Sequence, residues 1–299
     1  MRYLIGVDGS PKSLEAVRLV GRLADPDADA VAICFSPLEL ERQLPGQSRE
    51  VIAGAVDGLF EEVCGLLPSG LARKPERIRV DQPAAVALLE SAATWKADVL
   101  VVGARGHGTI EGFILGSVSR AVVHGAHLPV LVARAVPPAS RGPRVLVGHH
   151  PASAASVAAT LGRIHWPDGT EGGVIGVTES LLAGPLPDWV GKRVRDPDTA
   201  AIALAWQQEH EAELERLGGT LAAFAAGLPE AFRRRPPIVA EGNPGERILE
   251  RAAADHAELI VVGRAPNDAF SRWLIGSTSE AVLTRAAASV LIVPVERQG

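Results

Sequence analysis

An internal repeat constrains this chain more than any other feature of its sequence. Residues 97–103 read ADVLVVG, and residues 257–263 read AELIVVG. Shortly after each of these segments, FILGSVSRAVV at 113–123 is matched by WLIGSTSEAVL at 273–283. Self-similarity of this kind marks a repeated structural unit. In a chain of 299 residues, the repeat predicts two related domains in tandem.

The start of each copy indicates where the domains divide. RYLIG at 2–6 corresponds to RVLVG at 144–148, and the stretch PPASRGP at 137–143 is rich in the residues that form linkers. We therefore predict a first domain over 1–136, a linker over 137–143 and a second domain over 144–299.

Each domain alternates short apolar runs with helical patterns, which predicts an α/β fold with a doubly wound parallel sheet. The run at 99–102 is uniformly apolar, as expected for a strand that is covered on both faces. Ser10 and Pro11 together are typical of a helix start. The predicted strands of the first domain are 4–7, 31–35, 78–80, 99–102 and 130–133, and its predicted helices begin at Pro11 or span 51–67, 83–96 and 117–124.

The second domain repeats this order but is enlarged in the middle. Residues 178–237 separate its second predicted strand, 173–177, from its third, near Ile238 and Val239. Within the enlargement, residues 201–224 have the spacing of one long amphipathic helix. This helix either packs on its own domain or offers a surface to a partner. The apolar residues near one of its faces are Trp206, Leu214, Leu217, Leu221 and Phe224.

The segment with the clearest chemical meaning follows the strand at 99–102. Gly103 is followed by two residues and Gly106, and then by nine residues and the pair Gly116-Ser117. Gly103 ends a strand at its carboxyl edge, where doubly wound sheets bind ligands, and Ser117 opens a helix whose free amides favour an anion. A tight turn without a ligand would use some of the same glycines. The complete spacing predicts a phosphate-binding loop.

This segment resembles the ATP-binding pattern of the universal stress protein family, as do the opening GVDGS at 6–10 and the PVLV at 129–132. The resemblance implies the adenine nucleotide alpha hydrolase-like version of the fold. It also implies a ligand, which is ATP or another adenine nucleotide, with or without Mg²⁺. It assigns the nucleotide contacts to Gly6, Val7, Asp8, Ala30, Val31, Val102, Gly103, Arg105, Gly106, Gly116, Ser117, Val118 and Ser119.

Within this set the resemblance implies separate roles. Asp8 would contact the nucleotide, with Mg²⁺ where the ion is present, and the backbone near Ala30 and Val31 would flank the adenine. The ribose and phosphates would be lined by Val102, Gly103, Arg105 and Gly106, and residues 116–119 would hold the phosphates. Two alternatives stay open, because Asp8 is also suited to capping the helix that begins at Pro11, and Arg105 is also suited to a solvated loop.

The second half departs from the pattern at two places. Pro266 stands where the first half has Gly106, and proline removes a backbone donor. His150-Pro151-Ala152 aligns with Asp8-Gly9-Ser10, so the carboxylate and the cap are both absent. We predict that this half does not bind a nucleotide as family members do, and an altered ligand stays open. His149 and His150 lack further ligands at a recognisable spacing, so no metal site is predicted.

These features favour an ATP-binding regulator of the stress response over two alternatives. One alternative is a weak ATP hydrolase, and the other is a scaffold or adaptor that works without nucleotide through an unknown protein partner. No residue is assigned to catalysis, since the sequence has neither a Gly-x-x-x-x-Gly-Lys-Ser/Thr loop nor a kinase signature. The net charge of −5 argues against nucleic acid and acidic membranes, and no apolar run approaches the length of a bilayer span. We expect a cytoplasmic protein.

The last strand of each half carries a prediction about assembly. The predicted strands at 130–133 and 290–293 are apolar and close their domains, and an exposed apolar edge favours pairing. The family resemblance implies that such strands pair with each other. We therefore predict an intramolecular pseudo-dimer with approximate two-fold symmetry, and leave open whether two chains associate further.

Overall fold

The computed structural model describes residues 1–38, 49–68, 70–104, 115–134, 141–179, 197–264 and 276–295. The first half contains β1 (Arg2–Gly6), α1 (Pro11–Leu23), β2 (Ala30–Phe35), α3 (Arg49–Gly65), β3 (Glu76–Arg79), α4 (Ala84–Trp95), β4 (Val99–Gly103), α5 (Ser117–Gly125) and β5 (Val130–Ala133). The second half contains β6 (Arg144–His149), η1 (Pro151–Ser153), α6 (Ala154–Arg163), β7 (Glu171–Thr178), α8 (Pro197–Ala226), η2 (Glu230–Phe232), β8 (Ile238–Glu241), α9 (Pro244–Ala254), β9 (Leu259–Arg264), α10 (Ser277–Arg285) and β10 (Ser289–Pro294).

The strands of both halves form one continuous sheet. Its order is β3-β2-β1-β4-β5-β10-β9-β6-β7-β8, which reads as the same five-strand order on either side of its centre. Strands within a half are parallel, whereas β5 and β10 are antiparallel, with Leu131 opposite Leu291. The predicted α/β fold and the predicted pairing of the last strands are both confirmed. The domain boundaries stay a prediction, and residues 135–140 lie outside the described residues.

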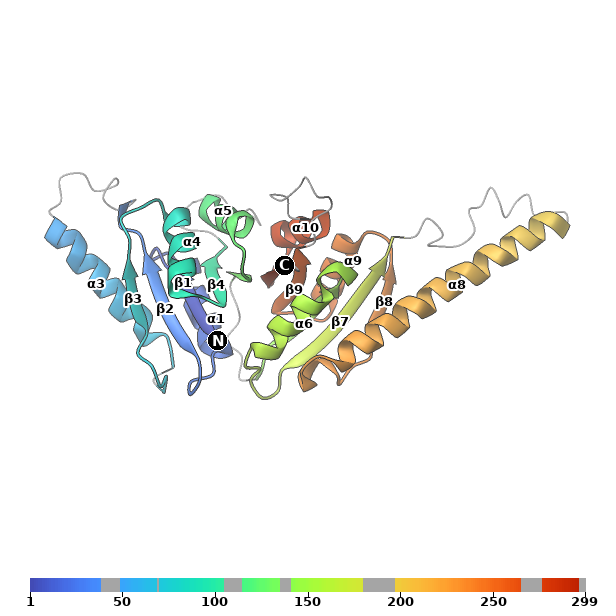
Figure 1. Cartoon of the computed structure of the whole chain (residues 1–299), viewed down its shortest axis with the longest axis horizontal. Coiled ribbons are helices and arrows are strands. Elements are labelled where there is room, and N and C mark those ends of the chain that lie inside the picture. The colour runs from blue at the N-terminus through green and yellow to red at the C-terminus, as the bar shows by residue number, and fades with distance from the viewer. Residues whose placement is uncertain are drawn as a thin grey trace.

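Helices cover both faces of this sheet, which gives the molecule two hydrophobic cores. One core joins the sheet to α1, α3, α6 and α8, and the other joins it to α4, α5, α9 and α10. Each core contains residues from both halves. In Figure 1, α5 and α10 lie near the middle of the molecule, and α3 and α8 lie at its two outer ends. All residues of β2 and β4 are buried, as the uniformly apolar run at 99–102 predicted.

Two elements differ from their predicted extents. β3 begins at Glu76, two residues before the predicted start. Because β3 is an edge strand, its charged residues face solvent and its start shows no apolar pattern. α8 is 30 residues long and extends the predicted helix at both ends. Leu221 is fully buried against the sheet, whereas Leu204 is 56% exposed, and Figure 1 shows this outer part of α8 running past β8. The interpretation that the helix packs on its own domain therefore holds for its carboxyl-terminal part.

Candidate functional site

The predicted loop residues and Asp8 come together at one edge of the sheet. β1 ends at Gly6 and is followed by Val7 and Asp8, while the neighbouring strand β4 ends at Gly103. These two strands lie where the strand order of the first half reverses, so their carboxyl ends form the crevice at which doubly wound sheets bind ligands. Val102 is buried directly before Gly103 and anchors the strand end in the core.

The turn after β1 is organised by Asp8 and Ser10. The Oδ1 atom of Asp8 accepts a hydrogen bond from the Ser10 backbone N–H at 2.9 Å and a second from the Ser10 hydroxyl. Ser10 is the N-cap of α1, where its Oγ accepts from the Ser13 N–H, and Pro11 is the first helical residue, as predicted. Gly9 between them has a φ of 77°, which glycine adopts at no steric cost. The structure therefore shows Asp8 supporting the helix start, the alternative role identified in the sequence, and its nucleotide contact stays a prediction.

The end of β4 is tied directly to the start of α5. The Ser119 hydroxyl, which is buried, donates to the Gly103 carbonyl oxygen at 2.6 Å, and the Gly116 N–H donates to the Ala104 carbonyl oxygen at 2.8 Å. These two hydrogen bonds hold the end of β4 beside the start of α5. Gly116 is the N-cap of α5 and supplies no side-chain cap, so the first amides of the helix are available to an anion. Ser117 and Val118, the first two residues of α5, are exposed.

Gly103 has a structural reason to be glycine that is independent of any ligand. A Cβ atom at this position would lie 2.7 Å from the carbonyl carbon and oxygen of Lys12, so the start of α1 could not pack there. The equivalent Gly263 is in the same situation, because a Cβ there would collide with Ser153. The glycine that ends this strand is thus retained in both halves by helix packing, and the case for a phosphate site depends on the uncapped helix start.

Ala30 and Val31 are not part of this site, which corrects the prediction that they flank an adenine there. The strand register pairs Ala30 with Arg2 at the amino end of β1, whereas Gly6 is paired with Cys34. Ala30 and Val31 therefore lie at the opposite edge of the sheet from Asp8 and Gly103. The residues of β2 that reach the carboxyl edge are Phe35 and, directly after it, Ser36. Two other predicted residues, Arg105 and Gly106, lie outside the described residues.

The second half has a cavity of about 560 Å³ at the equivalent edge. Its first wall comes from the ends of β6 and β9 and the start of α10, and its second wall comes from the end of β7 and one face of α8. The start of α10 repeats the geometry of α5, since the Ser279 hydroxyl donates to the Gly263 carbonyl oxygen at 2.6 Å. The polar residues that line the cavity are His149, His150, Thr178, Glu179, Glu213, Arg216, Thr220, Ser277, Thr278 and Ser279.

The two histidines of this cavity have different surroundings. His150 accepts a hydrogen bond through Nδ1 from the Ala152 N–H at 3.2 Å, which is the contact that Asp8 makes in the first half. The His149 ring packs edge-on against Phe224 with 4.8 Å between centroids. Burial lowers the pKa of His149, and the nearby charge of His150 lowers that pKa further. The sequence did not predict a wall from α8, because periodicity shows that a helix is amphipathic but not which cavity it closes.

Among the described residues, no group of three or more His, Cys, Asp and Glu side chains is arranged to hold a metal ion. None of the helices in the described part of the chain combines the length and apolar character needed to span a bilayer.

Comparisons with known proteins agree with this fold. The model of the universal stress protein family matches residues 1–134 and 190–294. A universal stress protein of Mycolicibacterium smegmatis is 26% identical over 308 residues, which cover 97% of this chain and 96% of that relative. A universal stress protein of Mycobacterium tuberculosis is 29% identical over 197 residues, which are 65% of this chain and 58% of the relative's length.

A solved structure resembles the chain over almost its whole length. The crystal structure of a universal stress protein from Archaeoglobus fulgidus superposes with a TM-score of 0.62 at 18% identity, covering 99% of this chain and 98% of that one. At this identity the likeness concerns the fold, and it includes the tandem arrangement. Because the family model covers both halves, the chain belongs to the universal stress protein family.

Proposed function

We propose that the first half binds an adenine nucleotide, ATP, and that the protein acts as a nucleotide-dependent regulator in the stress response. The observation that carries this proposal is the junction of β4 and α5, where a strand end at the switch point meets a helix start without a side-chain cap. A helix start of this kind offers several backbone N–H groups and a partial positive charge of about half a unit to a phosphate.

The loop residues complete the proposed site. Gly103, Arg105 and Gly106 would follow the phosphates, and the amides of 116–119 would bind them. Because the Ser119 hydroxyl already donates to Gly103, we assign its phosphate contact to the backbone N–H. Asp8 supplies an exposed carboxylate at the same edge, and this oxygen ligand suits a Mg²⁺ ion that arrives with the nucleotide.

A regulatory role is supported by where α5 ends. Arg264, the last residue of β9 in the second half, donates through Nη1 to the carbonyl oxygens of Val123 at 3.2 Å and Ala126 at 3.1 Å. The helix that would hold the phosphates at its start is therefore held at its end by the other half. α5 therefore connects the proposed phosphate site to the seam between the halves, where β5 pairs with β10, and this contact is what supports a regulatory role.

Calorimetry with Mg·ATP tests this proposal, and we expect about one equivalent per chain. Ser117→Asp places a carboxylate in the first turn of α5, where the helix dipole favours it but a phosphate is repelled. The affinity should fall at least about tenfold. The matched variant Ser277→Asp, at the same position of α10, should bind Mg·ATP like the wild type. Two equal sites, or a Ser117→Asp protein that binds normally, would contradict the proposal.

A second variant tests the loop. Gly106→Pro introduces the residue that the second half has at the corresponding position. We expect it to abolish Mg·ATP binding while the far-ultraviolet circular dichroism stays unchanged, since proline removes an N–H donor and fixes φ. Unchanged affinity in a folded Gly106→Pro protein would show that the loop is not the site.

A further inference from the structure

We propose that the cavity of the second half is a separate binding site for a phosphate monoester whose body carries hydroxyl or amine groups, and that it binds this ligand without Mg²⁺. Every described residue that lines the site belongs to the second half. The proposal therefore does not depend on ATP binding in the first half.

The size and walls of the cavity are those of a small-molecule site. Its volume of about 560 Å³ lies in the usual range for ligand pockets. Val177, Leu217, Ile248 and Val262 form an apolar part of the lining, and polar groups occupy the rest. α8 takes the place that α3 has in the first half, but its cavity wall includes Glu213 and Arg216, whereas Leu59 of α3 lies beside the turn at Gly9. The ligand therefore need not resemble that of the first half.

One end of the cavity is suited to a single phosphate. Gly276, the N-cap of α10, makes no side-chain cap, and Ser277 and Thr278 line the cavity at the first turn of the helix. The start of α9 is different, because Asn243 caps it by accepting from the Glu246 N–H at 3.1 Å. Of these two helix starts at the cavity, α10 is the one whose amides are left to a ligand.

His150 places an imidazole where the first half has the carboxylate of Asp8. Its Nδ1 atom accepts from the Ala152 N–H, so in the neutral ring the proton is on Nε2. The cavity therefore gains an N–H donor where the first half has a carboxylate. A donor attracts a phosphate or carbonyl oxygen, and it removes an oxygen ligand that a Mg²⁺ ion would need.

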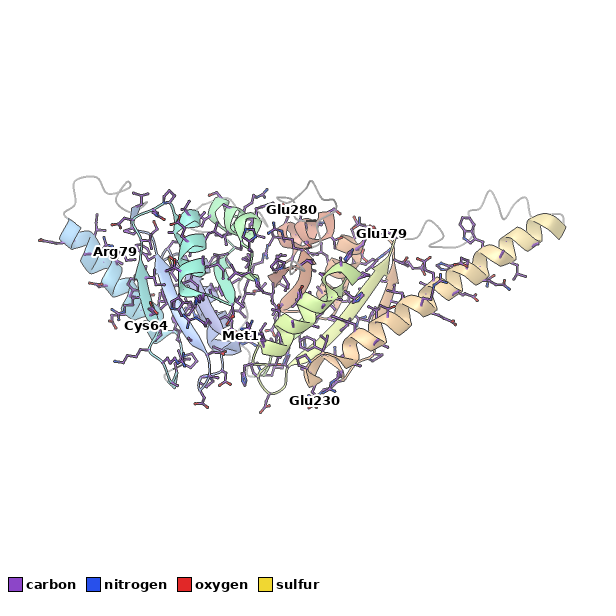
Figure 2. The ribbon with its side chains drawn as sticks, in the orientation of Figure 1. Met1, Cys64, Arg79, Glu179, Glu230 and Glu280 are labelled. Carbon is purple, nitrogen blue, oxygen red and sulfur yellow. The ribbon has the colours of Figure 1, made fainter. Side chains whose placement is uncertain are left out.

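The opposite wall explains why the ligand should carry one phosphate and not three. Glu179 and Glu213 line the cavity there, with Glu213 Oε1 accepting from the Thr178 hydroxyl at 2.6 Å. Figure 2 shows Glu179 at the end of β7. Arg216 also lines this wall, and it pairs with Glu209 at 2.9 Å. Carboxylates repel a polyphosphate chain but accept hydrogen bonds from hydroxyl and amine groups, so phosphate and body are directed to opposite ends.

Calorimetric titration of the full-length protein with ribose 5-phosphate in EDTA tests the proposal. We expect about one equivalent per chain. Ser277→Asp should lower the affinity at least about tenfold by placing a negative charge beside the phosphate, whereas Ser277→Ala should retain most of it, since the backbone amides remain. Ser117→Asp, at the equivalent position of the first half, should bind ribose 5-phosphate like the wild type.

A second variant guards against a general loss of structure. His150→Asp keeps a side-chain oxygen that can accept from the Ala152 N–H, as Asp8 does from Ser10, so the fold should be retained while ribose 5-phosphate binding is lost. The proposal is overturned if the wild type binds no ribose 5-phosphate, if binding requires Mg²⁺, or if Ser117→Asp abolishes it while Ser277→Asp does not. The last result would place the ligand in the first half, and the Mg·ATP titration would then report separately on that half.

Discussion

Asp8 and His150 occupy equivalent positions and accept a hydrogen bond from equivalent backbone N–H groups. The local turn is therefore preserved although the charge is lost. This explains how the second half keeps its fold with a residue that changes the chemistry of its cavity. Sequence comparison of the halves shows the substitution, but only the structure shows that the imidazole accepts the same backbone hydrogen bond.

The neighbouring His149 gives a prediction about pH. Its pKa in the folded chain lies below the ordinary value because of burial first and the charge of His150 second. Between about pH 6.5 and the lower folded pKa, the unfolded chain binds a proton that the folded chain does not, so stability should fall as the pH is lowered. His149→Phe keeps the edge contact with Phe224 and removes the titration.

Denaturant unfolding at a series of pH values checks this prediction. Wild type and His149→Phe should differ in the slope of unfolding free energy against pH below about pH 6.5, with the shallower slope in the variant. Above that range the two slopes should be parallel. Identical slopes throughout would show that His149 does not contribute to the acid sensitivity.

Ala30 and Val31 lie at the amino end of β2, away from the predicted site. The run at 31–35 was recognised as a strand, and in a parallel sheet only its far end reaches the carboxyl edge. The sequence therefore contained enough information to place Phe35 and Ser36, and not Ala30 and Val31, at the carboxyl edge of the sheet. By contrast, the packing of Gly103 against Lys12 could not be predicted, because it depends on how α1 crosses the sheet.

Among elements, α5 and α10 play matching roles at both of their ends. Their starts are free of side-chain caps, and their ends are held across the seam by arginines from the opposite half. Arg264 holds the end of α5, and Arg134 holds α10 by donating to the carbonyl oxygens of Leu283 and Ala288. Cations at helix ends also interact favourably with the helix dipole.

Arg134 supports a prediction about the seam. It is 7% exposed, and burial lowers its pKa to about 10, so it stays charged at neutral pH. Arg134→Met should destabilise the protein by about 1–3 kcal/mol, because two carbonyl oxygens lose a charged donor. Arg120 also crosses the seam, but it is half exposed and lies 3.9 Å from Glu280, which Figure 2 shows at the middle of the molecule.

Arg120→Met is therefore the matched control. A solvent-exposed ion pair contributes about 0–1 kcal/mol, so this variant should unfold close to the wild type. Denaturant unfolding of both variants makes the comparison. Equal effects from the two substitutions would show that burial of Arg134 adds nothing to the stability of the seam.

Most elements could be predicted because their signals are local. Apolar periodicity, Ser10-Pro11 and the repeat were sufficient for the strand–helix order, whereas the pairing of β5 with β10 was predicted from the family resemblance. The charged start of β3 was missed because edge strands do not show the apolar run of a central strand. The wall that α8 contributes to the cavity is a long-range contact, which local patterns do not report.

At the scale of the whole molecule, the seam is interior to both hydrophobic cores. Leu131 and Leu291 face one core, while Val132 and Ile292 face the other, and all four are buried. Because neither core ends at the seam, the two halves should lose their structure together. Unfolding monitored by two probes, one in each half, should give coincident transitions.

Charge at the seam should damage both halves. Val132 is 0% exposed and Ile292 is 2% exposed, so Val132→Asp or Ile292→Asp buries a carboxylate and should cost about 4 kcal/mol or more. Val86→Asp on α4 is the control, since Val86 is 43% exposed and its replacement should cost about 1 kcal/mol or less. If only the half that carries the seam substitution unfolds, the halves are energetically separate.

The strongest test separates the halves. Residues 1–136 expressed alone would leave the edge of β5 and the apolar face around Leu131 without the cover that β10 provides. An exposed apolar edge pairs with another strand, so this fragment should form a homodimer through β5 or aggregate, and the matching fragment 144–299 should do the same through β10. Mixing the two fragments should restore a heterodimer, because Val132 can again pair with Val290 and Val130 with Ile292, as in the intact chain. Sedimentation analysis distinguishes these species, and a stable soluble monomer of either fragment would show that the halves are independent domains on a linker.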